Sequence, residues 1–483
     1  MSLTGTLSNA ISGLSAAARS AELVSTNLAN AMTEGYARRE LVLASTKPGG
    51  PGGVRVDGVQ RLADPALAQD LRLAVAGRDA ASARADALSR LEALFGLPGE
   101  PGALTARVTA FEARLSEAAA DPSATVRLDA AVLSASDLVT GITRAADGIQ
   151  ALRTEADREI AGMVSQINDG LSDVAGLNQR IQQARAAGRD TAGLEDVRQQ
   201  AIDALSGLVP LREVRRDGGS VALYSMGGAI LLDGSPARLD FTPARSVTPY
   251  MTLQNGQLSG LTLSGIPLRT GADGQVSGGA LGAAFELRDE LAVSAQSRLD
   301  AFARDLVERV SAPGVDPTLA PGAPGLFTDA GTAFLPADEP GLSQRLALNP
   351  AIDPEGGGAT WRLRAGLGAA VPGASGAGSI LLALGDSLST PRMPASGDFG
   401  ALTVPAAGLA AEIVSSLGAL RQHGEGALSF ANAAADELAQ ERRRLGVDTD
   451  QEMQKLLVVE TLYNANARVI QAVDDMLDTL TRL

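Results

Sequence analysis

The chain has 483 residues, enough for about three domains of ordinary size. It contains no cysteine and carries a net charge of −15, which excludes disulfides, thiolate metal sites and cysteine catalysis and disfavours nucleic acid as a partner. No run of about eighteen apolar residues exists, so no membrane-spanning segment is expected. Aromatic residues make up 3% of the chain, so its core must be built from aliphatic side chains.

The N-terminal residues predict a helix with one apolar stripe. Heptad position a holds Leu7, Leu14, Ala21 and Leu28, and position d holds Leu3, Ala10, Ala17, Val24 and Ala31. Because the d row is mostly alanine, the backbone of a partner helix can approach closely. Asn30 and Gly35 follow the stripe. Since both residue types tolerate positive φ, we expect the chain to turn there.

Alternating apolar residues between Leu41 and Leu62 predict a β-hairpin, which is split by the glycine-rich stretch Lys47–Gly53. Glycine-rich loops can also bind phosphate. This one lacks the Lys-Ser/Thr pair of a P-loop and does not precede a helix, so the phosphate-binding interpretation is disfavoured.

The next part of the chain is predicted to be a bundle of long helices. The expected helices are Pro65–Phe95, Leu104–Ala119, a third from after Ser123 to Ala187 with possible interruptions, and Glu195–Leu208. The third helix keeps near-heptad spacing at Val126, Leu133, Leu138, Ile142, Ile149, Leu152, Ile160, Val164, Ile167, Leu171, Val174, Leu177 and Ile181. Long helices with alanine-rich stripes are typical of a helical bundle.

Between Pro210 and Gly279 the pattern changes to short strands and turns, as in Val221–Tyr224, Ala229–Leu232 and the Asn255-Gly256 turn. We expect a β-rich domain inserted between helices, which a short linker could replace without unfolding the rest.

Helices resume from Gly279 to Ser311. The proline- and glycine-rich stretch Ala312–Pro405 is either an irregular surface or a partly disordered segment, and Trp361–Arg364 predicts one short strand in it. A long helix follows Pro405, and Gly424 and Gly426 in its middle could bend it.

The last helix, Thr449–Leu483, has a broad apolar stripe. Position a holds Leu456, Tyr463, Ile470 and Leu477, position d holds Val459, Asn466, Val473 and Leu480, and position g holds Leu462, Val469, Met476 and Leu483. The Thr449–Glu452 sequence predicts a capping box at its start. A stripe this wide predicts partners: the two termini pair with each other, with the termini of neighbouring copies, or each docks on a globular core.

No catalytic, cofactor-binding or metal-binding residues are predicted. His423 has no nucleophile that can be placed beside it, and it is interpreted as a satisfied or solvated surface histidine. Asp474 and Asp475 point about 100° apart on a helix, which is poor geometry for sharing a metal or a proton. EF-hand, H-E-x-x-H and G-x-G-x-x-G patterns are absent from the sequence.

Three segments resemble one protein family. The residues Ser25, Asn27, Ala29, Asn30, Thr33, Gly35, Tyr36 and Arg38 form a pattern that resembles the N-terminal signature of bacterial flagellar axial proteins, and its Tyr36–Arg38 end is most similar to the hook-associated protein 1 (FlgK) family. The run from Tyr463 to Leu480 is similar to that family's C-terminal helix. Leu194–Ser206 matches the family's helix before its β domain only in part, because Glu195, Gln199 and Gln200 differ.

The resemblance implies a mainly α fold with an inserted β-rich domain. The expected division is a terminal coiled coil (1–38 and 449–483), a long helical stem (39–209 and 279–448) and an outer β-rich domain (210–278). The expected assembly-interface residues are Leu7, Leu14, Leu28, Asn27, Asn30, Gly35, Tyr36, Leu456, Val459, Tyr463, Ile470, Val473, Leu477 and Leu480.

The resemblance also implies a function. The expected role is a structural subunit of the bacterial flagellum that joins hook to filament and is secreted through the flagellum's own type III export channel, without a Sec signal. The implied partners are copies of itself in a helical ring, hook protein, the next hook-associated protein, the export apparatus and an export chaperone at the C-terminal helix. The alternatives are another axial protein of hook or rod, an exported coiled-coil adhesin or effector, and, last, an enzyme.

Overall fold

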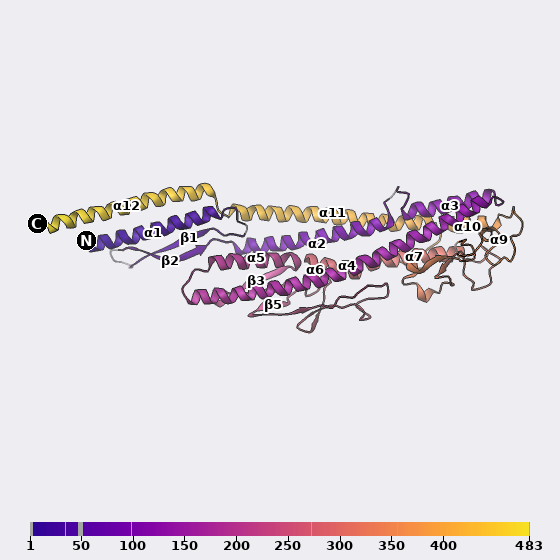
Figure 1. Cartoon of the computed structure of the whole chain (residues 1–483), viewed down its shortest axis with the longest axis horizontal. Helices are drawn as coiled ribbons and strands as arrows, with labels where there is room; N and C mark the ends of the chain where they lie inside the picture. Colours follow the sequence, from indigo (N-terminus) through magenta and orange to yellow (C-terminus); the bar gives the residue numbers. More distant parts are fainter. Residues whose placement is uncertain are drawn as a thin grey trace.

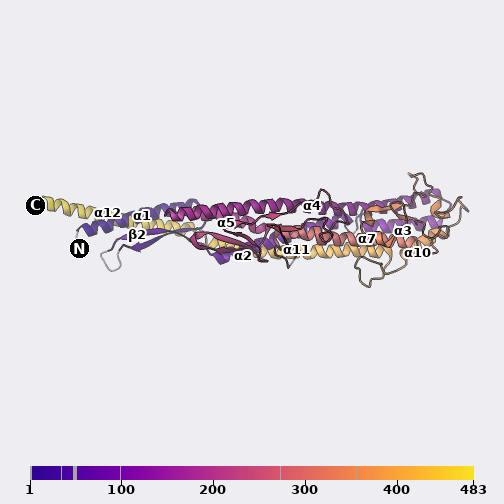
Figure 2. The same cartoon turned by 90° about the horizontal axis from the view of Figure 1, so that it is seen from below.

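The computed structural model describes residues 3–33, 35–46, 52–97, 99–271, 273–354 and 356–482. The molecule is a long rod, and both termini lie at the same end of it (Figure 1). A view from below shows the same elongated shape (Figure 2). Most of the glycine-rich loop, 47–51, and Leu483 of the expected g row lie outside the described residues.

Long helices dominate the described part of the chain. The α-helices are α1 (Leu3–Ala29), α2 (Pro65–Phe95), α3 (Leu104–Ala120), α4 (Thr125–Ala186), α5 (Ala192–Leu208), α6 (Gly279–Glu286), α7 (Ala292–Val310), α8 (Leu342–Arg345), α9 (Arg362–Ala365), α10 (Ser379–Ser389), α11 (Ala406–Arg444) and α12 (Thr449–Thr481). One π-helical turn, Leu287–Leu291, joins α6 to α7. The fold is therefore mainly α, as predicted.

The strands are short and form small antiparallel sheets. They are β1 (Arg39–Ser45), β2 (Val54–Arg61), β3 (Leu211–Arg215), β4 (Val221–Ser225), β5 (Ile230–Asp233), β6 (Ser235–Pro236), β7 (Leu239–Asp240), β8 (Leu261–Leu263), β9 (Ile266–Leu268), β10 (Phe327–Asp329) and β11 (Leu346–Leu348). The sheets have the strand orders β1-β2, β3-β4-β5-β6, β7-β8-β9 and β10-β11. The predicted hairpin is β1-β2, with a bulge between Val42 and Leu43.

The terminal region consists of α1, α12 and the β1-β2 hairpin. The helices α1 and α12 run antiparallel, since Gly13 meets Asn466 and Asn27 meets Glu452 (Figure 1). The hairpin lies against α1, where the Val54 N–H donates to the Ser12 Oγ (3.1 Å). The two contacts fix the register, and in this register the last turn of α12 extends past the described start of α1.

The stem is built along α4, which continues without interruption for 62 residues, about 93 Å at ~1.5 Å per residue. Helix α11 packs along α2, and α3 packs along α4 (Figure 2). Two apolar cores follow one another along α4. The one far from the termini joins α3, α7, α10 and the start of α11, and the nearer one joins α4, α5, α6 and strands β3, β4, β5, β7 and β8.

Two residues expected on the buried stripe of α4 are exposed instead, so their assignment was wrong. Val126 is 77% exposed and Leu133 is 64% exposed. The buried face at this level is made by Leu128, Ala131, Ala135 and Leu138. At about 100° per residue, these four residues lie on the opposite side of the helix from Val126 and Leu133.

The β-rich region shares its core with the stem. Leu223, Leu232 and Leu261 are fully buried in the same cluster as Ile160, Leu171 and Val174 of α4. Asp157 of α4 accepts hydrogen bonds from the Arg288 Nη1 and the Ala244 N–H, both at 2.6 Å. Because its apolar residues cover α4, we expect that exchanging the region for a linker would expose the stem core, contrary to the prediction from the sequence.

Polar bonds tie the same region to α4. The Arg153 guanidinium of α4 is buried and donates to the carbonyl oxygens of Thr248 (3.1 Å) and Met251 (2.8 Å). Burial lowers the pKa of Arg153 to about 10, so the group stays charged at neutral pH. The loop that carries these carbonyls is therefore fixed to the stem by a buried cation.

The proline- and glycine-rich stretch 312–405 is irregular, and most of it packs on the far end of the stem. The expected strand at Trp361–Arg364 is wrong, because α9 is one helical turn in which the Ala365 N–H donates to the Trp361 carbonyl (3.0 Å). Gly366 ends the turn with a φ of 103°. Arg364 is buried, and its guanidinium donates to the Pro122, Pro372 and Ser375 carbonyls. Irregular backbone thus supplies the acceptors for this buried cation.

Candidate assembly interface

The inner contact between α1 and α12 is made by small residues on α1. Ala10, Ala17 and Val24 of the predicted d row are buried, while Leu7, Leu14 and Leu28 of the a row are half-buried. On α12, Val473 is 3% exposed and Leu456, Val459 and Ile470 are half-buried. The two predicted stripes therefore face each other within one chain.

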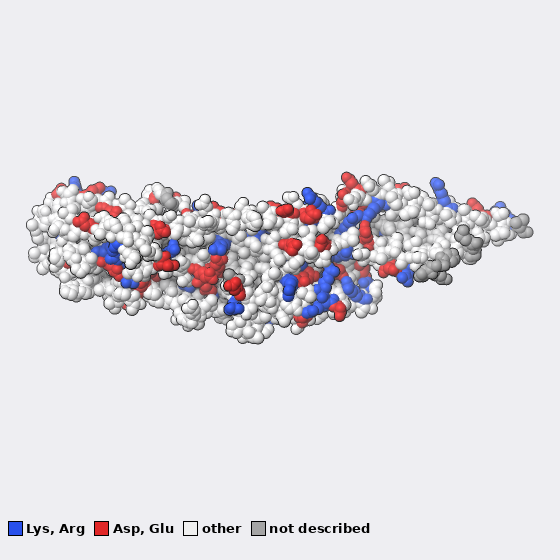
Figure 3. All heavy atoms as spheres, turned by 180° about the vertical axis from the view of Figure 1, so that it is seen from behind, with Lys and Arg blue, Asp and Glu red and all other residues white. Residues whose placement is uncertain are grey.

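The rest of the α12 stripe has no partner within the described part of the chain. Three predicted interface residues are exposed, Tyr463 (44%), Leu477 (42%) and Leu480 (58%). They belong to a larger set of exposed apolar residues, which partly continue the covered stripe and partly flank it and which we call the outer face of α12: Met453, Leu457, Val458, Leu462, Tyr463, Val469, Met476, Leu477 and Leu480. On the side seen in Figure 3, the terminal region carries few charged side chains, and charges gather over the adjoining part of the rod. An uncovered apolar surface along a whole helix is typical of a contact surface.

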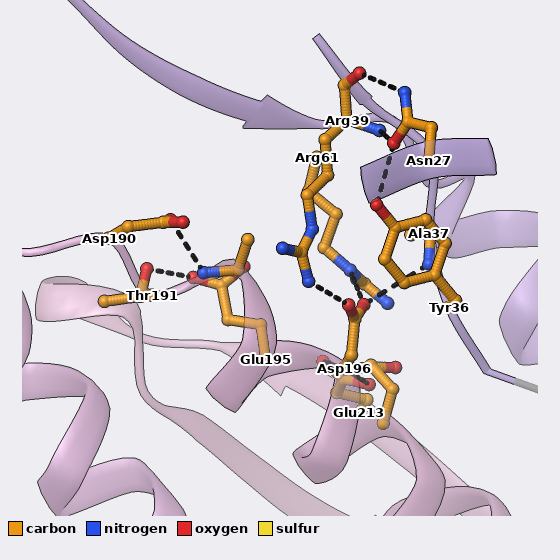
Figure 4. A network of polar contacts seen from close by, with 12 residues as sticks. Asn27, Tyr36, Ala37, Arg39, Arg61, Asp190, Thr191, Glu195, Asp196 and Glu213 are labelled. Atoms are coloured by element: carbon orange, nitrogen blue, oxygen red, sulfur yellow. Dashed lines mark hydrogen bonds and ion pairs between the residues drawn. The ribbon is translucent and has the colours of Figure 1, made fainter. Parts of the chain in front are cut away.

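At the base of this pair, the buried side chain of Asn27 joins three elements. Its Nδ2 donates to the Arg39 carbonyl (2.9 Å) and to the Glu452 Oε2 (3.0 Å). Its Oδ1 accepts from the Tyr36 hydroxyl (2.7 Å) and from the Arg39 N–H (3.1 Å), as Figure 4 shows. The amide thus uses both donors and both acceptor positions, and it fixes α12 and β1 to the end of α1.

Glu452, which is 1% exposed, is the partner of Asn27 on α12. Its Oε1 accepts from the Arg38 Nε (2.8 Å), so the buried carboxylate is paired. The predicted capping box is wrong in both of its roles. Asp448, not Thr449, caps α12 by accepting from the Asp450 and Gln451 N–H groups, which leaves Glu452 for the interior.

A second ion pair lies at the edge of the base. The Lys455 Nζ donates to the Glu40 Oε1, and this bond lowers the pKa of the Glu40 carboxyl. Glu40 is on β1 and Lys455 is on α12, so the pair also holds the hairpin and the last helix together. Both side chains are partly exposed, so the contact is weaker than the buried one.

Asp196 of α5 connects this base to the stem. Its two carboxylate oxygens accept from the Arg39 Nη2 (2.9 Å) and the Arg61 Nε (2.6 Å), and the Ala37 N–H points to it at 3.4 Å (Figure 4). The Arg39 guanidinium also lies 4.9 Å from the centre of the Tyr36 ring. Burial raises the pKa of Tyr36, with Arg39 opposing the shift, so its hydroxyl remains a hydrogen-bond donor to Asn27.

The turn between α1 and β1 needs a glycine at one of its two predicted positions. Gly35 has a φ of 76°, and a Cβ there would lie 2.7 Å from the Gln200 Cγ. The chain also turns at Asn30, as predicted, but without positive φ there. Its side chain instead donates to the Thr26 carbonyl (2.9 Å) and caps the end of α1.

Sequence reasoning missed Glu452, Arg39, Arg61 and Asp196 as members of this site. One signal was present for Glu452, because it occupies heptad position d, in an otherwise mostly apolar row, where a charge needs a buried partner. Arg39, Arg61 and Asp196 are far apart in sequence and follow no spacing, so only the packing of the hairpin on α5 brings them together.

No chemical site emerges from the described residues. Among them, no group of three or more His, Cys, Asp or Glu side chains could hold a metal ion. His423 is exposed on α11, as are Asp474 and Asp475 on α12. Helices that are long and apolar enough to cross a membrane are absent from the same part of the chain.

Comparisons with known proteins match this architecture to flagellar proteins. Residues 88–318 match the family described as "Flagellar hook-associated protein FlgK helical domain", and residues 444–483 match "Flagellar basal body rod FlgEFG protein C-terminal". The chain is 28% identical to flagellar hook-associated protein 1 of Salmonella typhimurium over 260 residues, which cover 52% of this chain and 46% of that protein.

Two further matches concern a bacterial relative and a solved structure. Flagellar hook-associated protein 1 of Bacillus subtilis is 25% identical over 240 residues, which cover 47% of each chain. A solved structure, the flagellar hook junction protein FlgK from Burkholderia pseudomallei, covers 55% of this chain and 47% of its own at 21% identity and a TM-score of 0.45. The matched region thus spans about half the length of the curated relatives.

Proposed function

Because the chain belongs to the family of the flagellar hook-associated protein FlgK, a family of flagellar axial structural proteins, we propose that it joins hook to filament as a self-assembling subunit. In this proposal α1 and α12 of many copies form an inner tube, and the stems form the layer around it. The partners are copies of the same chain, hook protein on one side and the next hook-associated protein on the other.

The observation that carries the proposal is that α1 covers only part of the apolar surface of α12. Val473 is buried and Ile470 is half-buried, while Leu457, Val458 and Leu462 are more than half exposed. Such a helix can keep its intramolecular partner and still bury apolar area against neighbouring copies. If a neighbouring copy covers half of an exposed Leu or Val side chain, that residue contributes about 1 kcal/mol to the binding free energy. Nine such residues are enough to hold neighbouring copies together.

The arrangement of the contact also supports a helical assembly. We propose that a different surface of the neighbouring copy covers the outer face of α12. Contacts of this heterologous kind propagate into rings or helices and do not close into dimers. We further propose that the chain reaches this site through the flagellar type III export channel, with a chaperone that covers the outer face of α12 before export.

Isolation of hook–filament particles tests the proposal. In a strain whose chromosomal copy carries a short epitope in the irregular stretch 312–405, antibody–gold should label a narrow zone between hook and filament. Deletion of the gene should leave hooks without filaments and release filament subunits into the medium. Label along the whole hook or rod would instead favour another axial protein, and label absent from the particles would favour an exported adhesin or effector.

A further inference from the structure

Phe430 on α11 is an exposed aromatic side chain that nothing in the described chain covers. It is 78% exposed, whereas the other eight phenylalanines of the chain are buried or half-buried. Its neighbours one turn away on the same helix face are Gly426, Ala427, Ala433 and Ala434, so no longer side chain of its own helix lies over the ring. Residues 426–435 contain no charged side chain.

A groove of matching character lies between α2, α4 and α6. It encloses about 380 Å³ and is lined by Ala83, Ala87, Gly162, Met163, Ala283 and Ala284. A cavity of about 150 Å³ is enough to hold benzene, so a phenyl ring and part of its helix fit in this one. A Cβ built on Gly162 meets nothing within 4 Å, which shows that the groove is open at that position.

The ring and the groove lie at nearly the same level along the rod. A Cβ on Gly424 would lie 3.1 Å from the Leu88 Cδ1, so this part of α11 is beside the groove-lining part of α2. Phe430 is six residues further, about 9 Å along the helix. Copies packed side by side with their long axes parallel therefore need only a small axial offset to bring one ring to the next groove.

The same chain cannot fill its own groove. On α2, Ala85, Leu88 and Glu92 face α11, as the contacts of Gly424 and Arg421 show. Ala83, Ala87 and Arg90 line the groove, and at about 100° per residue they lie on the opposite side of α2. The helix α2 thus separates the ring from the groove, and the occupant must come from another molecule.

Charge favours an uncharged or basic occupant. At one end of the groove, the lining residue Arg90 forms ion pairs with Asp86 and Glu155, and its charge also acts on the Glu159 carboxyl. Burial is the main cause that raises the pKa of the Glu159 carboxyl, and the negative charge of the neighbouring Glu155 raises it further. His423 lies seven residues before Phe430, two turns away on the same helix face, and would approach these carboxylates when the ring enters the groove.

We propose that Phe430 of one copy inserts into the α2–α4–α6 groove of the adjacent copy, as a stem-to-stem contact between neighbours. This inference rests on the proposed function, because it requires copies that lie side by side. It assigns the stem a specific role in lateral association, separate from the outer face of α12. The contact joins two different surfaces, so it propagates from copy to copy.

Thiol cross-linking tests the contact directly, because the chain has no cysteine of its own. The double variant Phe430→Cys/Gly162→Cys, treated with a short bis-maleimide in isolated hook–filament particles, should give dimers and higher multimers. The matched control is Phe430→Cys/Gly176→Cys, because Gly176 lies on the same helix, also in open space, about 21 Å away. Multimers from the first pair and none from the control are expected.

The outcomes separate this inference from the function on which it rests. If the unsubstituted chain is absent from the particles, both proposals fail. If it is present and the Gly162 pair gives no multimers, or no more than the Gly176 pair, the stem contact is refuted and the proposed function stands.

A size-exchange experiment gives a second readout. Phe430→Ala empties the groove and Gly162→Leu fills it, and each should lower the amount of chain retained in particles by about tenfold, as expected for a central aromatic anchor. Combining the two should recover part of the loss, while Gly176→Leu should change nothing. Normal retention of both single variants would overturn the proposal.

Discussion

Asn27 and Glu452 are 425 residues apart in the chain, yet the Asn27 Nδ2 donates a 3.0 Å hydrogen bond to the Glu452 Oε2 in the interior. The same carboxylate is paired with Arg38, and the same amide holds Tyr36 and Arg39. The N-terminal residues that resemble the flagellar signature therefore form one connected structure with the start of α12. The spacing of Asn27 and Tyr36 in the sequence therefore reflects the hydrogen bond between their side chains as well as the turn between them.

Asn27→Ala is expected to destabilise the terminal pair by about 2–4 kcal/mol, because Glu452 and the Arg39 backbone lose partners in a buried site. Hydrogen exchange of α1 and α12 in the purified chain measures the effect. The control is Asn30→Ala, which removes one partly exposed capping bond and should cost about 1 kcal/mol. Equal effects of the two variants would contradict a central role for Asn27.

Asp196→Asn is expected to loosen the terminal region from the stem while both remain folded. The neutral amide cannot satisfy Arg39 and Arg61 as the carboxylate does. Distances between spin labels on α12 and α5 should broaden, and the circular dichroism spectrum should stay unchanged. Asp190→Asn on the same surface, which leaves both arginines paired, serves as the control. A distance distribution as narrow as that of wild type would disprove the connection.

Charges placed on the two faces of α12 should have separable effects. Val473→Asp puts a carboxylate into the buried contact with α1 and should destabilise the monomer by several kcal/mol. Leu462→Asp lies on the outer face and should leave monomer stability within about 0.5 kcal/mol. The second variant should nevertheless abolish motility, with filament protein shed into the medium. Normal swimming of Leu462→Asp would show that the outer face does not take part in assembly.

Ile470 and Asp475 provide a further pair on the same helix. Ile470 is half-buried and Asp475 is exposed. Ile470→Asp should therefore stop assembly, and Asp475→Ala should change stability by only about half a kcal/mol and preserve swimming. Motility counts and secreted protein measure both. Identical behaviour of the two variants would mean that the α12 stripe is not an assembly surface.

Acid is expected to weaken the terminal pair through Glu40. The bond from Lys455 lowers the pKa of Glu40 below its ordinary value of 4.5. Because the folded pKa is the lower one, this stabilisation is present above pH 4.5 and is lost as the pH falls through the folded pKa. The difference in unfolding free energy between wild type and Glu40→Gln should therefore shrink from about pH 6 to about pH 3. A constant difference would contradict the assignment.

Replacing Leu211–Gly278 with a Gly/Ser linker is expected to unfold the nearer part of the stem. Ile160, Val164 and Leu171 of α4 would lose the strands that cover them. The helical circular dichroism signal should fall, although the deleted segment contains little helix. A fully retained signal with an unchanged melting temperature would show that α4 does not depend on the β region.

The helices could be predicted because each carries its own periodic signal. The stripes of α1 and α12 face each other as their heptads indicated, with Val24 and Val473 buried. The predictions of buried residues failed where tertiary packing, and not the spacing of large apolar residues, decides which side of a helix is buried. Val126 and Leu133 are apolar at helical spacing, yet alanines define the buried side of α4, and a count of large apolar residues does not detect alanines.

The base of the interface was only half predictable. Asn27, Gly35 and Tyr36 could be selected because they belong to a recognisable pattern. Glu452 was assigned to a cap because local spacing permitted it, although Asp448 is one residue before the predicted N-cap and serves the same purpose. Asp196 could not be found, since its two arginines come from both strands of a hairpin whose position depends on tertiary packing.

The connection between α11 and α12 has a consequence for the order in which the molecule forms. In an unfolded chain, bringing Asn27 to Glu452 closes a loop of 425 residues, at an entropic cost of about 5 kcal/mol plus a constant. Once α2 lies along α11, the loop still to be closed between Asn27 and Glu452 runs only through residues 28–64 and 445–451. The terminal pair is therefore conditional on a finished stem. In the proposed assembly, a subunit with a misfolded stem would offer no composite end, and we expect such a copy to be rejected at the growing tip.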